Sequence, residues 1–555
     1  MTRKAFIFLS LILFVVSSCT DNTRETVRGN STQLKSNPKL VVGIVVDQMR
    51  YDYLTRFYDR FGAGGFKRLI NQGFNCKNNH FNYIPTYTGP GHASVYTGTT
   101  PKYHGIISNN WYDKVLKDEV YCVSDEDILP VGTDDDYSKN SPNRMMVNTL
   151  SDELKLHTQQ RGKVIGIAIK DRGAVLPAGF SADAAYWFEG KDQGHWVSSS
   201  YYMDELPDWV KSFNDSGKVD SYMTVWDTLE DIDSYSESGP DLNDFEVGFS
   251  GKETASFPYD LASLRKQNGN YDLIKTTPFG NSITIDFALA ALEGEALGTD
   301  DFTDLLALSF SSTDYIGHNF GVNAKETQDT YLRLDAEISR LLDALDQRVG
   351  PGEYTVFLTS DHGAVHVPAF LESNNITSGY LSMRDLRTRL NEFMTRTYKT
   401  DELIESVGNF QIFLNHQKIK ALGLDLTQVQ EALVNEVINY EHIDKAYSAS
   451  TLHTNYFGDG VERMLQLGYH QKRSGDVLMV LNSAVISRGR KGTTHGSGYS
   501  YDTHVPLLFY GKGINKGSTV ERTEITDIAA TISAMLGVSF PNATIGEPIS
   551  KAISE

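Results

Sequence analysis

Five short apolar runs, rich in β-branched residues, recur along this chain and constrain its fold more than any other feature of the sequence. Polar and apolar residues do not alternate within them, as is typical of strands that are buried on both faces of a parallel sheet. Helical patterns lie between several of the runs, so the sequence predicts an α/β fold with a doubly wound, mostly parallel sheet sandwiched by helices. The runs cover residues 40–46, 164–169, 305–310, 354–358 and 505–510.

The alternation of strands and helices is interrupted by two long stretches, at about residues 175–300 and 365–490. We interpret them as insertions in one α/β domain that covers residues 38–555, and we expect them to cap the site at the carboxyl ends of the strands. Helical periodicity is clearest at residues 51–69, 327–345 and 527–536.

Residues 1–19 are typical of the signal peptide of an exported bacterial lipoprotein. Two cations precede an apolar run that is too short to span a bilayer, and the sequence Val-Ser-Ser-Cys, which resembles a lipobox, ends at Cys19. Ordinary signal cleavage near the same serines is the alternative. The polar residues 20–37 then form a flexible tether. We therefore expect a protein of the bacterial periplasm or cell envelope, with a lipid anchor at Cys19 if the lipobox is used.

The formal net charge of −20 excludes a general role in binding nucleic acid. A protein this acidic binds an anionic substrate only where a local positive centre overcomes its field, and bound metal ions supply such a centre. The two cysteines beyond Cys19, Cys76 and Cys122, form either one disulfide or two free buried thiols.

Acidic residues and histidines gather at the ends of the predicted strands. Taken alone, an aspartate after a strand is usually a helix cap or a turn residue. Six such residues at strand ends instead predict two metal sites, and mixed nitrogen and oxygen ligands favour zinc over magnesium. The spacing of four residues between Asp314 and His318 lets both face one ion, on a helical turn or in a loop. The six candidate ligands are Asp47, Asp314, His318, Asp361, His362 and His495.

Thr88 lies in the segment Thr-Gly-Pro-Gly-His, which is typical of a loop that enters a helix. The free N–H groups and the dipole of a helix N-terminus favour an anion, and the two glycines let the backbone approach a ligand closely. A threonine hydroxyl becomes a competent nucleophile when a metal lowers its pKa. The alternative is that Thr88 is only a helix cap.

These motifs resemble the alkaline phosphatase superfamily from about residue 40 to residue 545, and in particular its PafA-type monoesterases, which use threonine as the nucleophile. The resemblance implies two zinc ions per chain. It assigns one ion to Asp314, His318 and His495, and the other to Asp47, Asp361, His362 and the oxygen of Thr88. It also implies that a phosphoryl group is bound by Asn109, Lys170 and Arg172. Lys170 and Arg172 lie on the same side if the segment is extended.

The expected reaction is hydrolysis of small-molecule phosphate monoesters through a phospho-threonine intermediate, by a protein that acts as a monomer. One alternative is a phosphodiesterase or nucleotide pyrophosphatase of the same superfamily. Lys170 and Arg172 argue for monoesters, because a dianion needs more positive charge than a monoanion. A second alternative is a non-catalytic surface binding protein that zinc stabilises.

Overall fold

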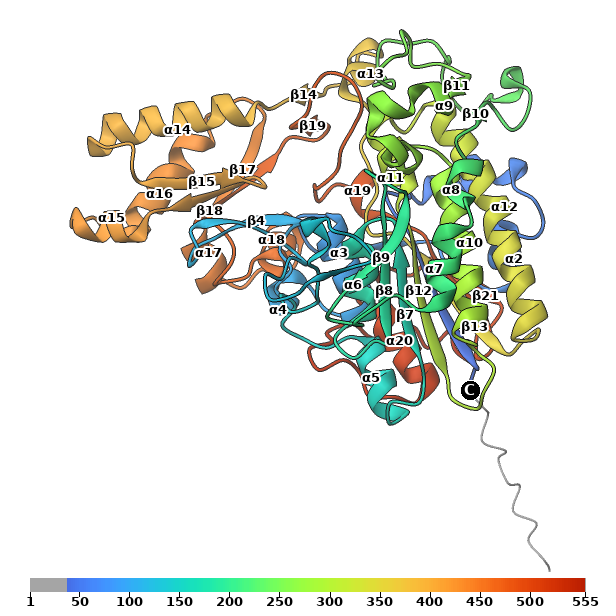
Figure 1. The fold of residues 1–555 in the computed structure, drawn as a ribbon. Coiled ribbons are helices and arrows are strands. Elements are labelled where there is room, and N and C mark those ends of the chain that lie inside the picture. The colour runs from blue at the N-terminus through green and yellow to red at the C-terminus, as the bar shows by residue number, and fades with distance from the viewer. Residues whose placement is uncertain (1–36, 555) are drawn as a thin grey trace, which may run out of the picture. The chain divides into compact units, whose positions relative to one another are not determined.

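The structure is a computed structural model that describes residues 37–554. The predicted signal peptide, Cys19 and the predicted tether up to residue 36 lie outside the described residues. The described chain is built on a ten-stranded sheet (Figure 1). Its strand order is β21-β2-β20-β13-β1-β12-β7-β8-β9-β6.

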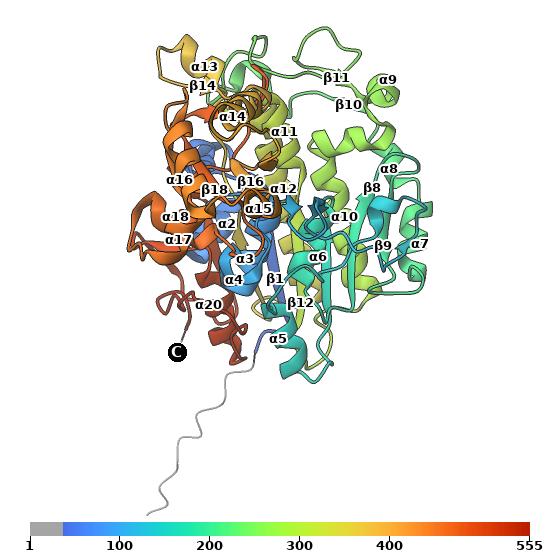
Figure 2. The same ribbon diagram turned by 90° about the vertical axis from the view of Figure 1, so that its left-hand side faces the viewer.

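The middle of this sheet consists of parallel strands. Four neighbours, β13 (Tyr354–Thr359), β1 (Leu40–Val46), β12 (Asp304–Phe310) and β7 (Val164–Ala168), run in the same direction. Their carboxyl ends therefore meet at one edge of the sheet. In Figure 2, which views the strands from the side of helix α3, β1 and β12 lie near the centre of the sheet. The predicted doubly wound, mostly parallel α/β fold is confirmed for the described residues.

Strand β20 (Leu507–Gly511) departs from the parallel pattern, because it pairs with β13 in the antiparallel sense. Its amino end consequently lies at the same edge as the carboxyl ends of the parallel strands. The sheet also changes direction at its other side, where β8 (Ala184–Glu189) is parallel to β7 but β9 (His195–Ser199) is antiparallel to β8.

Both faces of the sheet are covered by helices (Figure 1). Alternate residues of β1 enter two different hydrophobic clusters, with Val42 and Ile44 in one and Val41 and Val45 in the other. Helices α10 (Phe279–Gly294) and α12 (Lys325–Arg348) complete the first cluster. Helices α3 (Thr88–Thr97) and α20 (Asp527–Leu536) complete the second. The strands are apolar throughout because each face has its own core.

The helical pattern of residues 51–69 does not form one continuous helix. The segment forms α1 (Asp52–Arg56), a short 3₁₀ turn and α2 (Phe66–Gln72). Asp335 of α12 causes the break, because its carboxylate accepts hydrogen bonds from the backbone N–H groups of Gly62 (2.7 Å) and Phe66 (2.6 Å). The glycines between α1 and α2 allow this close approach.

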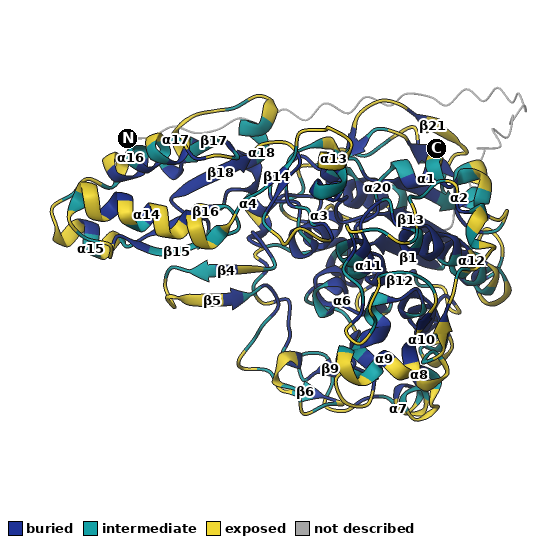
Figure 3. Ribbon diagram, turned by 90° about the horizontal axis from the view of Figure 1, so that it is seen from above, coloured by how far each residue is buried: buried dark blue, intermediate teal, exposed yellow. Residues whose placement is uncertain are grey.

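Residues 379–486, here called the lobe, carry a second sheet of the order β15-β16-β18-β17. Helices α14 (Met383–Tyr398) and α16 (Leu426–Val437) pack on this sheet around a separate hydrophobic core (Figure 3). Residues 175–300, by contrast, include β8, β9 and α10, which extend the main sandwich. The strands of the lobe are β15 (Ile404–Gly408), β16 (Gln411–Leu414), β17 (Ile443–Ser448) and β18 (Val477–Leu481).

Cys76 and Cys122 are free thiols, each buried in a different hydrophobic cluster. The alternative of two free buried thiols is therefore the one that the structure contains, and no disulfide joins these two cysteines. Within residues 37–554, no helix combines the length and the apolar composition that crossing a membrane requires.

The packing of β1 leads to a prediction about Gly43. A methyl group added at Gly43 would overlap with the hydroxyl of Tyr96 and with the ring of Phe357. Gly43→Ala should therefore lower the free energy of unfolding by about 1–3 kcal/mol, as overpacking does, in chemical denaturation. Gly489→Ala is the matched control, since the same methyl group there meets no atom within 4 Å. An equal, small effect of both variants would contradict the prediction.

Candidate metal centre

The predicted ligands meet at one edge of the main sheet. Asp47 follows β1 directly, Asp361 follows β13, and Asp314 lies in the first turn of α11 (Ser312–Phe320), which follows β12. His495 precedes β20, whose amino end reaches the same edge because the strand is antiparallel. Lys170 follows β7. The order of the strands thus brings together residues that are up to 448 positions apart in the sequence, from 47 to 495.

One group of ligand atoms is formed by Asp47, Asp361 and His362, all of which are fully buried. The Nε2 atom of His362 lies 3.5 Å from Asp47 Oδ1 and 3.5 Å from Asp361 Oδ2. None of these three buried atoms has a hydrogen-bond partner among the described residues. Buried polar atoms without partners are costly, and three that converge on one point fit a bound cation.

The second group consists of Asp314, His318 and His495. Asp314 Oδ1 lies 3.2 Å from His318 Nε2 and 3.7 Å from His495 Nε2. Asp314 and His318 are one turn apart on α11, so the spacing of four residues is helical. The two imidazoles of the second group come from different elements, one from α11 and one from the loop before β20.

Each of the three histidines uses Nδ1 to contact a backbone carbonyl. Because a carbonyl only accepts hydrogen bonds, Nδ1 must carry a proton, and Nε2 faces the other ligands. Burial lowers the pKa of His495 to about 3 and that of His362 well below its usual value, so both imidazoles are neutral ligands. The contacts join His318 to Thr493 (2.7 Å), His362 to Gly363 (3.0 Å) and His495 to Thr86 (2.7 Å).

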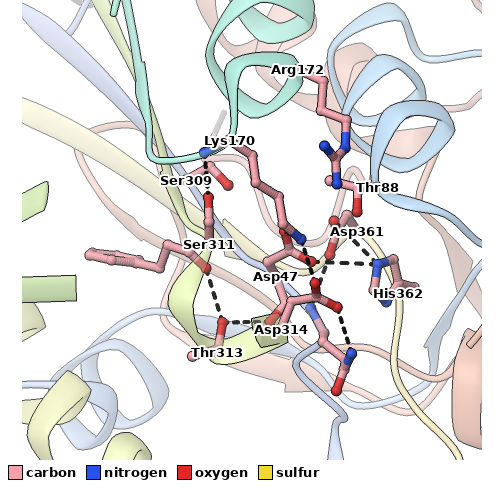
Figure 4. Close-up of polar contacts among 12 residues, drawn as sticks. Asp47, Thr88, Lys170, Arg172, Ser309, Ser311, Thr313, Asp314, Asp361 and His362 are labelled. Atoms are coloured by element: carbon pink, nitrogen blue, oxygen red, sulfur yellow. Dashed lines mark hydrogen bonds and ion pairs between the residues drawn. The ribbon is translucent and has the colours of Figure 1, made fainter. Parts of the chain in front are cut away.

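The buried carboxylates repel each other. Burial raises the pKa of Asp47 to about 6, and burial together with the charge of Asp47 raises the pKa of Asp361 well above its usual range. Lys170 offsets part of this charge, since its Nζ lies 2.6 Å from Asp47 Oδ2 and 2.5 Å from Asp314 Oδ2 (Figure 4). Lys170 therefore bridges the two groups of ligands, and each group retains oxygen and nitrogen donors for a divalent metal.

Thr88 is the first residue of α3, beside the group of Asp47, Asp361 and His362. Gly91, in the first turn of α3, is needed for this proximity, because a methyl group there would lie 2.7 Å from Cβ of Asp361. The backbone N–H of Gly89 donates to the Oδ1 atom of Asn109 (2.7 Å). The amide nitrogen of Asn109 therefore keeps its two protons for another acceptor.

The extended conformation predicted for residues 170–172 is wrong, because helix α6 (Asp171–Ala178) begins there. Lys170 precedes α6 and Arg172 lies in its first turn, yet both side chains turn toward the metal ligands and Thr88 (Figure 4). Nη1 of Arg172 donates to the hydroxyl of Tyr121 (3.0 Å). Lys170 and Arg172 both line a cleft of about 770 Å³.

Gln48 and Asp502 also hold the ligands, although no pattern in the sequence marks them. The amide of Gln48 donates to Asp314 Oδ1 (2.5 Å), and its backbone N–H donates to Asp361 Oδ1 (3.1 Å). A left-handed backbone, with φ of 64°, turns Gln48 toward both groups. Asp502 accepts hydrogen bonds from the backbone of Gly496 (3.1 Å) and Ser497 (2.8 Å), which fixes the loop that carries His495.

The sequence of residues 41–505 matches the family model described as type I phosphodiesterase/nucleotide pyrophosphatase. A protein of Myroides odoratus named calcium-transporting ATPase is 44% identical over 93% of this chain and 95% of its own length. Alkaline phosphatase PafA of Elizabethkingia meningoseptica is 40% identical over 94% of this chain and 96% of its own.

Crystal structures of alkaline phosphatase PafA have the same fold. The wild-type structure superposes with a TM-score of 0.90 and 39% identity, and the match covers 93% of this chain and 99% of that one. A second structure, with a TM-score of 0.89, carries substitutions of a threonine, an asparagine, a lysine and an arginine.

The contacts of Gln48 predict that it orients Asp314 for a metal. Gln48→Ala should weaken the affinity for Zn²⁺ by about 10- to 100-fold, as the loss of a hydrogen bond to a metal ligand typically does, in competition with a chromogenic chelator. Gln160→Ala is the matched control, because the exposed Gln160 has the same left-handed backbone, with φ of 65°. If the two variants bind Zn²⁺ equally well, Gln48 does not orient the ligand.

Proposed function

Because the chain belongs to the type I phosphodiesterase/nucleotide pyrophosphatase family of the alkaline phosphatase superfamily, we propose that it is an alkaline phosphatase that hydrolyses small-molecule phosphate monoesters. The observation that carries the proposal is the pair of ligand groups at the carboxyl edge of the sheet, with Thr88, Lys170 and Arg172 beside them. Full-length similarity to an alkaline phosphatase at 40% identity supports it.

The two groups are proposed to hold one zinc ion each. Asp314, His318 and His495 would bind one ion. The other would be held by Asp47, Asp361, His362 and the hydroxyl oxygen of Thr88. Bound zinc lowers the pKa of a coordinated hydroxyl and stabilises the charge that develops during phosphoryl transfer. The neutral histidines and the unpartnered carboxylate oxygens support this assignment, since zinc takes such ligands at about 2.0–2.2 Å.

Thr88 is the proposed nucleophile. Thr88 is the first residue of α3, where the dipole of the helix favours an anion. The threonine oxygen would attack phosphorus in line with the ester oxygen, which leaves as the alcohol, and water would then hydrolyse the phospho-threonine. The positive end of α3 stabilises the phosphoryl group before and after its transfer to Thr88.

Asn109, Lys170 and Arg172 are proposed to bind the non-bridging oxygens of the phosphoryl group. The free amide protons of Asn109 and the guanidinium of Arg172 supply hydrogen bonds, and Lys170 supplies a buried positive charge. The PafA variant with a substituted threonine, asparagine, lysine and arginine supports this choice, because the four proposed residues are of the same types in the same order.

Hydrolysis of phosphodiesters is the second candidate, because the description of the matching family model favours it. A diester carries one negative charge on its non-bridging oxygens and a monoester carries two, so the cations Lys170 and Arg172 favour the monoester. ATP is a further test substrate, since its terminal phosphoryl group is also dianionic and one relative is named an ATPase.

Export to the bacterial periplasm or cell envelope, with a lipid anchor at Cys19, is proposed from the N-terminal sequence. The mass of the mature protein tests it. A chain that begins after residue 19, without an acyl group, would exclude the anchor but not the export.

The proposed nucleophile predicts a strong dependence on residue 88. Thr88→Ala should lose several orders of magnitude in kcat/KM for a chromogenic monoester, while Thr88→Ser should retain much more. Enzyme that is quenched with acid during turnover of labelled substrate should carry the label on Thr88, as detected by mass spectrometry of peptides. Quenched enzyme that carries no label there would rule out the covalent route.

The proposed phosphate ligands predict a change in substrate preference. Lys170→Ala should depress kcat/KM for a monoester by about 100- to 1,000-fold, as the loss of a group that stabilises the transition state does, and should depress it less for a matched diester. The measurement is the ratio of monoester to diester kcat/KM in each variant, with ATP and a sulfate ester assayed beside them. An unchanged ratio would mean that Lys170 acts on both substrates alike.

A further inference from the structure

A chain of hydrogen bonds holds the guanidinium of Arg172 from the side of the cleft. Nη1 of Arg172 donates to the hydroxyl of Tyr121 (3.0 Å), and this hydroxyl donates in turn to Asp171 Oδ1. The amide of Asn140 donates to the second oxygen of Asp171 (3.1 Å). Three residues thus form one connected support for Arg172. We call them the Arg172 brace: Tyr121, Asp171 and Asn140.

The brace holds Arg172 without a direct ion pair. Tyr121 is the one hydrogen-bond partner of the guanidinium within residues 37–554, and Nε of Arg172 is buried without any partner there. Burial raises the pKa of Tyr121 well above its usual value, and the charge of Asp171 adds to this effect, so the phenol stays neutral. A neutral oxygen fixes the direction of a guanidinium but leaves its positive charge available, whereas a carboxylate in contact would cancel much of it.

The location of Tyr121 connects the brace to the other phosphate ligands. Tyr121 ends β5 (Asp118–Tyr121), which pairs with β4 (Asn110–Asp113) in a hairpin. The residues that flank the two ends of this hairpin are joined, because the N–H of Cys122 donates to the carbonyl of Asn109 (2.8 Å). Asn109, which lies next to Gly89, and Tyr121, which contacts Arg172, are therefore held together at the open end of the hairpin.

The body of the hairpin is fixed at a distance from the site by the lobe. Tyr112 donates to Glu405 of β15 (3.1 Å), and Lys117 pairs with the same carboxylate (2.9 Å). The amide of Asn409 donates to the carbonyl of Asn110 (2.7 Å). These contacts hold the hairpin in place but do not touch Arg172, so they provide a comparison for the brace.

We propose that Tyr121 is a positioning residue, which aims the guanidinium of Arg172 at the phosphoryl group, and that Asp171 and Asn140 fix the hydroxyl of Tyr121 for this purpose. The inference rests on the proposed function, in which Arg172 binds a phosphoryl oxygen. The hydroxyl of Tyr121 accepts from the arginine and donates to the aspartate, so neither neighbour replaces it. Its removal leaves Arg172 without its anchor in the brace.

Tyr121→Phe tests the proposal because it removes only the hydroxyl. We expect kcat/KM for a monoester to fall by about 10- to 100-fold, the range expected when a catalytic contact shifts by about 1 Å, and the inhibition constant for inorganic phosphate to rise. A matched diester should lose less. Tyr112→Phe is the matched control, since it removes a phenol bonded to a carboxylate on the same hairpin, and its activity should stay near that of the wild type.

A double variant that carries Tyr121→Phe and Arg172→Ala distinguishes the positioning of Arg172 from a general effect of Tyr121 on the stability of the protein. If Tyr121 acts through Arg172, Tyr121→Phe should have little further effect once Arg172 is alanine. A full, independent loss in the double variant would overturn the proposal, and so would a Tyr121→Phe enzyme with wild-type kinetics beside an impaired Arg172→Ala enzyme. If Arg172→Ala alone leaves monoester turnover and phosphate inhibition unchanged, the role assigned to Arg172 fails, and the brace fails with it.

Discussion

The burial of three aspartates at one edge of the sheet is the constraint on which the rest of the site depends. Carboxylates without water repel each other strongly, and they persist in a folded protein only when positive charge or hydrogen bonds compensate them. Asp47, Asp314 and Asp361 are all nearly inaccessible to solvent. Lys170 compensates two of them, Gln48 donates to two, and histidines complete each group. One lysine does not balance three carboxylates, and the negative charge that remains fits the binding of cations at this edge.

The sheet meets this constraint by its order and direction. Neighbouring parallel strands end at one edge, so β1, β12 and β13 each deliver one aspartate there without a long excursion of the backbone. Small residues then let other elements approach. Gly43 gives room to aromatic rings behind β1, and Gly91 lets α3 reach Asp361. The start of α3 at Thr88 lies so close to the ligand groups that a methyl group at Gly91 would not fit between them.

Much of the centre was predictable, because a buried apolar run followed by a polar residue is a local pattern. Asp47 and Asp361 stand out in the sequence for that reason, and the structure brings them together with His362. The break in the helical segment at residues 51–69 was not predictable, since it depends on a carboxylate from another helix. Tyr121 lies 50 residues from its partner Asp171, and no local pattern records such a contact.

The antiparallel direction of β20 has a consequence for the order of events during synthesis. The second ligand group draws Asp314 and His318 from the middle of the chain, but His495 comes from the loop before β20. A nascent chain that ends before residue 495 therefore has only part of this group, and in it β13 still lacks its antiparallel partner β20. Assembly of the group requires contacts between residues far apart in the sequence, which form slowly. The second ligand group is accordingly completed late in folding, after β20 has paired with β13.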